Sequence, residues 1–455
     1  MTQEPEIDIG DIIDAQTLRV FNIKLLVWSF LMVMADGYDF SAAGFAAPSL
    51  IKAWHIQNLA ALGPVFSASL VGIALGAPLL GYVADRIGRK TTLITGAVIF
   101  GVLTLVATQA SGVMPFLILR VLAGIGLGGV MPISIALNTE YAPRRLRATL
   151  VTLMFCGFSV GVGLPGFVAA WLVPSYGWQA IFLFGGLFPL VIAACVAFTL
   201  PESAKYLVLQ GNRHKELVAI VRKLAPSLTI PVNARFVMRE ETQSGRPSFG
   251  QLFAGDLAVK TPLLWVLFAT VGMVLYFIQT WSPTLLGSVG VSPAHAAIAT
   301  TLYQIGSLAG TLALGLPIDR YGMRPLTVAL VLAVPSVACL GLPGLSEPVL
   351  MGLFFVCGAL TIGGQNALSA VAGMIYPSFI RANGVGTCFA IVRVGSIIGT
   401  MTAGFLIASK VPMEKLFLIT AVPMAIAVIA AYLLGRVHIH QHAAPAAVPQ
   451  TVEAD

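Results

Sequence analysis

The sequence predicts an all-α integral membrane protein in which twelve transmembrane helices form two related halves of six helices each. Three observations lead to this prediction. First, 57% of the 455 residues are hydrophobic and only 10% are charged, whereas a soluble domain carries about 25% charged residues. Second, the apolar residues gather into runs of roughly 20, the length of helix that crosses a bilayer. Third, short charged motifs recur at one fixed displacement along the chain.

The expected spans are apolar runs bounded by charged residues, prolines and glycines. In the first half, 23–200, we expect helices at 23–49, 60–83, 92–111, 114–138, 148–172 and 179–200. A polar stretch, 201–260, then forms a central loop. In the second half, 261–435, we expect helices at 261–286, 296–317, 325–345, 348–374, 384–408 and 414–435. The N-terminal segment 1–22 and the tail 436–455 are expected to lie in the cytoplasm.

The distribution of basic residues predicts the orientation. With both termini cytoplasmic, Lys52, Lys410 and Lys415 are the only Lys or Arg residues in outer loops, and cytoplasmic loops normally carry the excess of these residues. We therefore attribute the net charge of +7 to the basic cytoplasmic loops of a protein in a lipid bilayer, and not to binding of nucleic acid. The acidic start of the chain differs from the basic start of a secretory signal, so the first span is expected to remain in the protein.

Several motifs recur 234 residues apart, which indicates two halves of common build. The first is Asp85-Arg86-Ile87-Gly88, which returns as Asp319-Arg320-Tyr321-Gly322. The second is Pro143-x-x-x-Arg147-Ala148, which returns as Pro377-x-x-x-Arg381-Ala382. Gly161 and Gly395 are related by the same displacement. One short match could arise by chance, but three matches at the same displacement indicate that the two halves share a common build.

Away from the ends of the expected spans, four charged residues lack a charged counterpart in the other half: Asp36, Asp39, Arg120 and Arg393. An acid near the bilayer centre costs roughly 2.5–3.5 kcal/mol on insertion scales, so such residues usually mark proton relays or charged-ligand sites. Asp36 and Asp39 share one helix face, and we predict that they carry a coupled proton. A buried Arg needs a carboxylate partner. We predict that Arg120 engages Asp36 or Asp39 and that Arg393 meets a substrate carboxylate, with helix packing as the alternative for Arg393.

The chain also resembles a known family of transporters. The loop Gly81-Tyr82-Val83-Ala84-Asp85-Arg86-Ile87-Gly88-Arg89-Lys90 resembles the signature of the major facilitator superfamily, whose fold has two parallel halves with a site between them. Arg120, Glu140-x-x-Pro143-x-x-x-Arg147 and Pro201-Glu202-Ser203 match further habits of that superfamily. The element Asp36-Gly37-Tyr38-Asp39 is narrower and resembles the aromatic acid:proton symporter family.

The resemblance implies a multi-pass protein of the bacterial inner membrane that imports hydroxybenzoates, benzoates or related ring carboxylates with protons. Its expected partners are a small aromatic carboxylate, protons and lipid, and we expect a functional monomer without a cofactor. In this superfamily, charges present in both halves latch the cytoplasmic face while the outer side is open. The corresponding gating network here consists of the repeated residues Asp85, Arg86, Asp319 and Arg320, with Glu140, Arg147 and Arg381 as candidates to pair with them. A structural turn with solvated charges is the alternative.

Polar and aromatic residues within the spans are further candidates for substrate binding. Side-chain amides at membrane depth must find partners, so they bind ring hydroxyls or bond between helices, and the sequence does not separate these roles. The polar candidates are Tyr303, Gln304, Gln365 and Asn366. The aromatic side chains that could stack a ring, with core packing as the alternative, are Tyr38, Phe40, Tyr276 and Trp281.

Other classes of protein fit the sequence less well. The first alternative is another major facilitator carrier, such as a drug/proton antiporter or a transporter of sugars or other organic acids, although intramembrane Arg residues suit an anion better than a sugar. The second is a membrane receptor or enzyme, for which the sequence shows no metal-ligand cluster and no sizeable soluble domain to carry signalling. The glycine pairs Gly72–Gly76, Gly124–Gly128 and Gly157–Gly161 are expected only to let helices pack closely.

Overall fold

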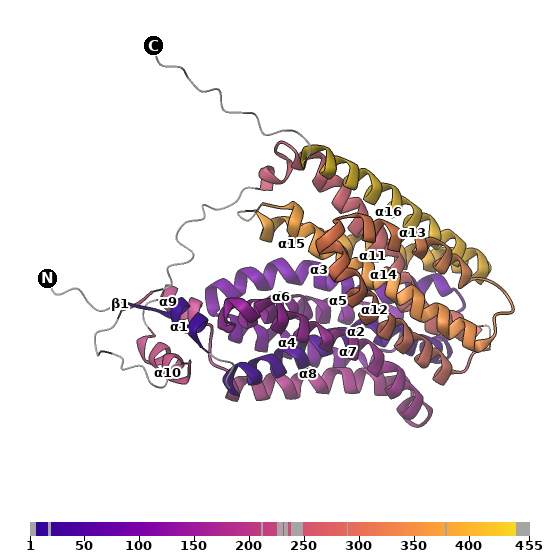
Figure 1. Ribbon diagram of the computed structural model, residues 1–455. Coiled ribbons are helices and arrows are strands. Elements are labelled where there is room, and N and C mark those ends of the chain that lie inside the picture. Colours follow the sequence, from indigo (N-terminus) through magenta and orange to yellow (C-terminus); the bar gives the residue numbers. More distant parts are fainter. Residues whose placement is uncertain are drawn as a thin grey trace, which may run out of the picture. The chain divides into compact units, whose positions relative to one another are not determined.

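The apolar runs form long helices in the computed structural model (Figure 1). The structure describes residues 6–16, 20–210, 213–224, 231, 235–237, 249–288, 290–377 and 380–442. Within these residues, eleven helices are long and apolar enough to cross a membrane. The all-helical class predicted for the membrane part is therefore confirmed.

The first six predicted spans lie in helices that are joined by short connections. These helices are α2 (Val20–Ala53), α3 (Leu62–Ile87), α4 (Arg89–Ala107), α5 (Val113–Gly128), α6 (Val130–Tyr141), α7 (Arg147–Tyr176) and α8 (Gln179–Thr199). The fourth span comprises both α5 and α6, which together make one apolar segment, Val113–Tyr141, interrupted at Gly129. The last six predicted spans lie in α11 (Leu257–Ser288), α12 (Pro293–Tyr321), α13 (Arg324–Cys339), α14 (Glu347–Ile375), α15 (Arg381–Ala408) and α16 (Met413–His442).

Helix α13 is shorter than the span predicted at 325–345. It has 16 residues, which at 1.5 Å per residue is roughly 24 Å, less than the ~30 Å hydrocarbon core. A turn follows it, in which Gly344 adopts a φ of +77° that favours glycine. The apolar composition continues through this turn, so composition alone extended the predicted helix too far. The count of twelve membrane helices stays a prediction.

The chain divides into two compact units. Unit 1 comprises Met1–Gly245, Tyr276–Gln304 and Ser396–Leu416, and unit 2 comprises Arg246–Leu275, Ile305–Gly395 and Phe417–Asp455. Unit 1 thus contains α2 to α8, and unit 2 contains α13 and α14, while α11, α12, α15 and α16 contribute to both. This division does not test the predicted boundaries of the two six-helix halves.

Glycines bring the helices of unit 1 into backbone contact. A Cβ atom at Gly161 on α7 would overlap the carbonyl oxygen of Met34 on α2. On α3, Cβ atoms at Gly72 and Gly76 would likewise overlap the carbonyl oxygens of Val121 and Ile125 on α5. The predicted role of these glycines in close packing is confirmed.

The 234-residue repeat recurs in the packing contacts of unit 2. A Cβ at Gly306 on α12 would overlap the carbonyl oxygen of Phe355 on α14, and one at Gly310 would overlap that of Ala359. Each of these four positions is 234 residues beyond its counterpart in the α3–α5 contact. The repeat read from charged motifs is thus also a repeat of helix packing.

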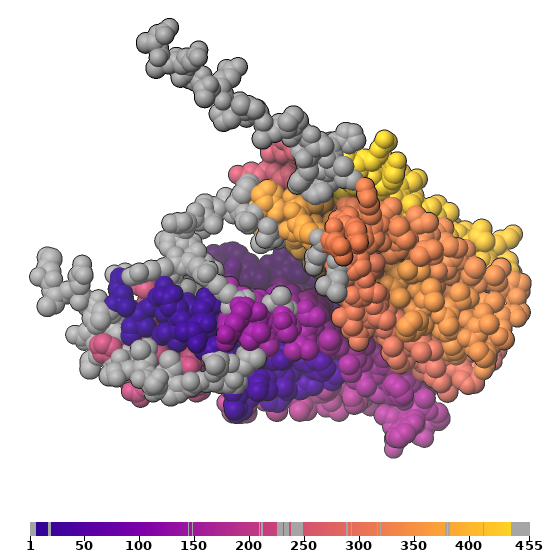
Figure 2. All heavy atoms as spheres, viewed as in Figure 1, coloured from indigo at the N-terminus to yellow at the C-terminus, as the bar shows by residue number. Residues whose placement is uncertain are grey.

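A small cap covers one end of the helices of unit 1 (Figure 1). We define it as β1 (Glu6–Asp8), α1 (Ile9–Ala15), α9 (Ala204–Gln210), α10 (His214–Leu224) and β2 (Arg235–Val237). β1 pairs in parallel with β2, with Glu6 opposite Arg235. Ile9, Ile13 and Leu217 are buried in a core that continues to Tyr141 at the end of α6. Figure 2 shows α1 in indigo against the magenta helices.

Candidate functional site

Asp39 lies in the middle of α2, and both of its carboxylate oxygens are bonded. Arg120 on α5 places its Nη2 2.6 Å from Asp39 Oδ1, and the two side chains are 1% and 3% exposed. Ser69 on α3 donates a hydrogen bond of 2.7 Å to Asp39 Oδ2. Three helices therefore meet at one buried carboxylate. The predicted pairing of Arg120 with one of the two acids is confirmed, and the partner is Asp39.

The Arg120 guanidinium is only partly satisfied by this ion pair. In the described part of the chain its Nε and Nη1 atoms are buried without a hydrogen-bond partner. The guanidinium carbon of Arg120, Cζ, lies 5.3 Å from the centroid of the Phe182 ring on α8. At this distance the face of an aromatic ring attracts a cation. Phe116 and Trp178 pack edge-on around this ring. These rings pack beside the guanidinium but accept no hydrogen bond from its Nε and Nη1 atoms.

Asp36 lies one turn before Asp39 on α2 and is also buried, at 3% exposure. Between the two acids, Tyr38 points toward α8, where its hydroxyl donates a 2.8 Å hydrogen bond to the carbonyl of Ile181. A Cβ at Gly185 would come within 2.9 Å of the Tyr38 ring. Tyr38 is thus a packed core residue of unit 1, consistent with the structural alternative weighed for it.

Phe40 is the aromatic candidate that keeps part of its surface open. It is half-buried and lies four residues after Asp36, on the same helix face. Its ring centroid is 4.4 Å from that of Tyr276 on α11, at an interplanar angle of 88°, and 5.6 Å from that of Phe158 on α7. Trp281 differs, because it is fully buried and donates its N–H to the carbonyl of Thr400.

The polar candidates of α12 and α14 form bonds between helices. Gln304 Nε2 is 3.3 Å from Gln279 Oε1 on α11, and the neighbouring Tyr303 is buried. In unit 2, exposed Asn366 donates a 3.0 Å hydrogen bond to Thr311 on α12. These contacts favour the interhelical role that the sequence left open for Gln304 and Asn366.

Gln365 differs from these residues because its amide is not satisfied. The side chain is 7% exposed, and within the described residues neither its oxygen nor its nitrogen has a hydrogen-bond partner. A buried amide without partners costs about 1–3 kcal/mol. Arg393, in α15 of the same unit, is half-buried. Its predicted role toward a substrate carboxylate stays a prediction.

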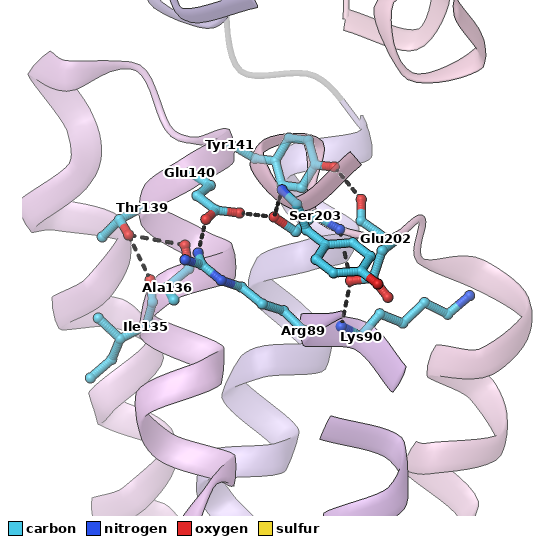
Figure 3. A network of polar contacts seen from close by, with 10 residues as sticks. Arg89, Lys90, Ile135, Ala136, Thr139, Glu140, Tyr141, Glu202 and Ser203 are labelled. Atoms are coloured by element: carbon cyan, nitrogen blue, oxygen red, sulfur yellow. Dashed lines mark hydrogen bonds and ion pairs between the residues drawn. The ribbon is translucent and has the colours of Figure 1, made fainter. Parts of the chain in front are cut away.

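A polar network closes the end of unit 1 beside the cap (Figure 3). The Glu202 carboxylate accepts hydrogen bonds from the backbone N–H groups of Lys90, at 2.8 Å, and Thr91, at 3.3 Å. It thereby satisfies the free donors at the start of α4, where negative charge is also favoured by the helix dipole. Gly88, with a φ of +104°, makes the turn, and a Cβ there would overlap Glu202.

The gating residues predicted in unit 1 take different places in this network. Glu140 forms an ion pair with Arg89 and accepts a hydrogen bond from the Ser203 hydroxyl (Figure 3). Arg147 instead donates to the carbonyl of Ala142. Asp85 and Arg86 are exposed, and Arg86 lies over the Tyr82 ring. Arg89, Glu202 and Ser203 are members of the network that the prediction omitted, although all three stand in the motifs from which it was drawn.

The second-half counterparts are only partly described. The side chains of Asp319 and Arg381 lie outside the described part of the structure, although their backbones belong to α12 and α15. Arg320 is exposed and lies 5.5 Å from the centroid of the Tyr321 ring. The predicted latch of this half stays a prediction.

The chain is similar to proteins of known family over nearly its whole length. The family described as Major Facilitator Superfamily matches residues 29–292 and 264–453. The 4-hydroxybenzoate transporter PcaK of Acinetobacter baylyi is 34% identical over 435 residues, 95% of each chain. The gallate transporter of Pseudomonas putida is 35% identical over 441 residues, 97% of each chain.

Solved structures resemble the fold at low sequence identity. A bacterial homolog of the human lysosomal transporter Spinster has a TM-score of 0.74 at 17% identity, covering 94% of this chain and 100% of that chain. A D-xylose-proton symporter has a TM-score of 0.69 at 18% identity, covering 91% of this chain and 97% of that chain. At such identities the likeness shows the fold alone.

Proposed function

The chain belongs to the major facilitator superfamily, and on that premise we propose that it is a proton-coupled symporter that imports an aromatic carboxylate by alternating access. Relatives named as transporters of 4-hydroxybenzoate, gallate and benzoate are 31 to 35% identical to it over almost their whole length. We place it in the bacterial inner membrane, with twelve spans and both termini in the cytoplasm. The substrate class follows from these relatives, whereas the coupling follows from the buried charges.

The buried ion pair of Asp39 and Arg120 is the observation that supports proton coupling. An Arg keeps its proton inside a protein, so only the acid can change charge. When Asp39 takes up a proton, Arg120 is left as a buried cation whose carboxylate partner has become neutral, which is unfavourable. Proton uptake therefore favours a rearrangement of α2, α3 and α5. A proton can drive the transport cycle only through such a difference between conformations.

The carboxylate of the substrate needs a fixed positive charge, and we assign this role to Arg393. A guanidinium binds a carboxylate through two parallel charge-assisted hydrogen bonds. The unsatisfied amide of Gln365, in the same unit, is suited to a ring hydroxyl because it offers both a donor and an acceptor. Together these groups match a hydroxybenzoate better than a neutral sugar.

The closing network beside the cap gives a candidate for the cytoplasmic latch. The pair of Glu140 with Arg89 and the bonds of Glu202 to α4 tie the ends of α4 and α6 to the segment after α8. Such a network can bias one of two conformations when it forms in only one of them. We propose that Asp319, Arg320 and Arg381 serve the corresponding place in the second half.

The test is uptake of labelled 4-hydroxybenzoate into proteoliposomes with an acidic exterior. We expect accumulation that a protonophore abolishes and that gallate and benzoate inhibit, whereas xylose does not. Asp39→Asn should lose accumulation because its side chain cannot exchange a proton. Accumulation that is unaffected by the protonophore would exclude proton coupling, and inhibition by xylose alone would exclude the aromatic substrate.

A further inference from the structure

We propose that Ser69 on α3 is a positioning residue that sets how readily Asp39 takes up and releases the coupled proton. This inference rests on the proposed proton-coupled function and adds a group outside the charged residues. Ser69 and Asp39 are both buried, so water does not screen their 2.7 Å hydrogen bond. With Arg120 on the other oxygen, Ser69 completes the set of donors to the carboxylate.

The bond made by Ser69 is not the one that a serine ordinarily makes in a helix. A serine inside a helix commonly donates to the carbonyl four residues earlier. Ser67, two residues before Ser69 and equally buried, does this, because its hydroxyl is 2.7 Å from the Gly63 carbonyl oxygen. Ser69 instead donates across the helix interface to α2. The two serines therefore differ in partner while sharing a helix, a chemistry and a depth of burial.

Glycine at position 124 brings α5 close enough for this arrangement. A Cβ at Gly124 would overlap the carbonyl oxygen of Ser69 and would lie 3.0 Å from the Cα of Gly72. Gly124 is four residues after Arg120, so both lie on the same face of α5. The same helix contact therefore brings Ser69 and Arg120 to the two oxygens of one carboxylate.

The hydroxyl suits a group that must gain and lose a proton. A donor to an ionised carboxylate stabilises the ionised form, so Ser69 assists release of the proton. A hydroxyl also has acceptor lone pairs and can rotate, so it can accept a hydrogen bond from the neutral acid after the proton has bound. Arg120 cannot make this exchange, because its guanidinium only donates. The cycle makes and breaks only the O–H bond of Asp39, because the proton that binds from one side of the membrane is released to the other side.

Substitution of Ser69 leaves the other charged and titratable groups of the surrounding helices unchanged. Asp36 and Tyr38 flank Asp39 on α2, Arg120 faces it from α5, and Tyr276 on α11 contacts the adjacent Phe40. The remaining such groups on α2 and on the described helices α3 and α5 to α8 are Lys24 and Lys52 on α2, Tyr82, Asp85 and Arg86 on α3, Glu140 and Tyr141 on α6, Arg147, Cys156 and Tyr176 on α7, and Cys195 on α8. Ser69 variants leave all of them unchanged.

The experiment compares Ser69→Ala and Ser69→Cys with Ser67→Ala in proteoliposomes. Gradient-driven uptake of 4-hydroxybenzoate is measured over a series of external pH values. Loss of a hydrogen bond to a charged group should move the alkaline decline of uptake upward by about one pH unit in Ser69→Ala. Ser69→Cys should fall between this variant and wild type because a thiol is a weaker donor. Ser67→Ala should keep the wild-type profile.

The outcomes separate this inference from the proposed function. If Ser69→Ala keeps the wild-type pH profile while Asp39→Asn has lost accumulation, the inference is overturned and the function stands. The inference is also overturned if Ser67→Ala shifts the profile as much as Ser69→Ala, since the effect then comes from helix packing. If Asp39→Asn accumulates substrate like wild type, the coupling part of the proposed function is wrong and Ser69 loses its role with it.

Discussion

At the scale of single residues, Arg120 determines the stability of the buried charge cluster. Arg120→Ala would leave the Asp39 carboxylate buried without a cation, which costs about 3–5 kcal/mol in comparable pairs. We expect a large fall in the thermal unfolding temperature of the purified protein in detergent. The matched control is Arg213→Ala, because Arg213 and its partner Glu216 are 48% and 51% exposed and 3.7 Å apart. Such exposed pairs contribute about 0–1 kcal/mol, so equal losses in the two variants would contradict the prediction.

Arg393 is expected to act on binding more than on stability. If it holds the substrate carboxylate, Arg393→Ala should weaken equilibrium binding of 4-hydroxybenzoate by about 10- to 100-fold, the value of a hydrogen bond to a charged group. Arg393→Lys keeps the charge but loses the planar pair of donors, so its affinity should be intermediate. Arg324→Ala, an exposed Arg of the same unit, serves as the control. Wild-type affinity in Arg393→Ala would leave Arg120 as the candidate for the anion site.

The sequence could predict the charged residues of the site but not their polar partners. Charge inside an apolar run is rare and costly, so Asp36, Asp39 and Arg120 stand out, but which of the two acids pairs with Arg120 is shown only by the structure. A serine in an apolar helix is ordinary, and nothing in the pattern separates Ser69 from Ser67. Glu202 stands in a motif that the sequence shows, but its bonds become apparent only once the fold brings the segment after α8 to the start of α4.

At the scale of helices, glycine contacts should be intolerant of even one methyl group. Gly161→Ala would place a Cβ against the carbonyl oxygen of Met34 and force α7 away from α2. Gly163→Ala is the matched control two residues further along α7, where the nearest atom is Thr301 Oγ1 at 3.9 Å. We expect Gly161→Ala to lose thermal stability and transport, whereas Gly163→Ala keeps both. Comparable behaviour of the two variants would argue against the close α2–α7 contact.

Helix existence was predictable from composition, but helix ends and breaks were not. Long apolar runs have few alternatives to helix in a bilayer, because every backbone polar group must be bonded within the segment. The end of α13 at Cys339 and the break at Gly129 between α5 and α6 depend on local turns that leave hydropathy unchanged. The glycine spacing predicted that certain helices pack closely, but the partner of each helix is shown only by the structure.

At the scale of the whole molecule, topology is the expectation that most needs a direct measurement. The positive-inside pattern predicts that the loop containing Lys52 faces outward and that the central loop containing Arg213 faces the cytoplasm. Lys52→Cys and Arg213→Cys, each in a background without native cysteines, should therefore react with a membrane-impermeant thiol reagent from opposite sides. Labelling of both from the same side would require a different number of spans between them.

The parallel pairing of β1 with β2 constrains the order in which the chain assembles during synthesis. Glu6 is made before α2, but its partner Arg235 follows only after α2 to α8 have been made. Domains generally fold as units during synthesis, and the entropic cost of closing so long a loop rises only slowly with its length. Strand β1 therefore cannot pair until the intervening membrane helices α2 to α8 have been made. Because β2 precedes α11 in the chain, closure of the cap requires completion of the earlier helices but not insertion of the later ones.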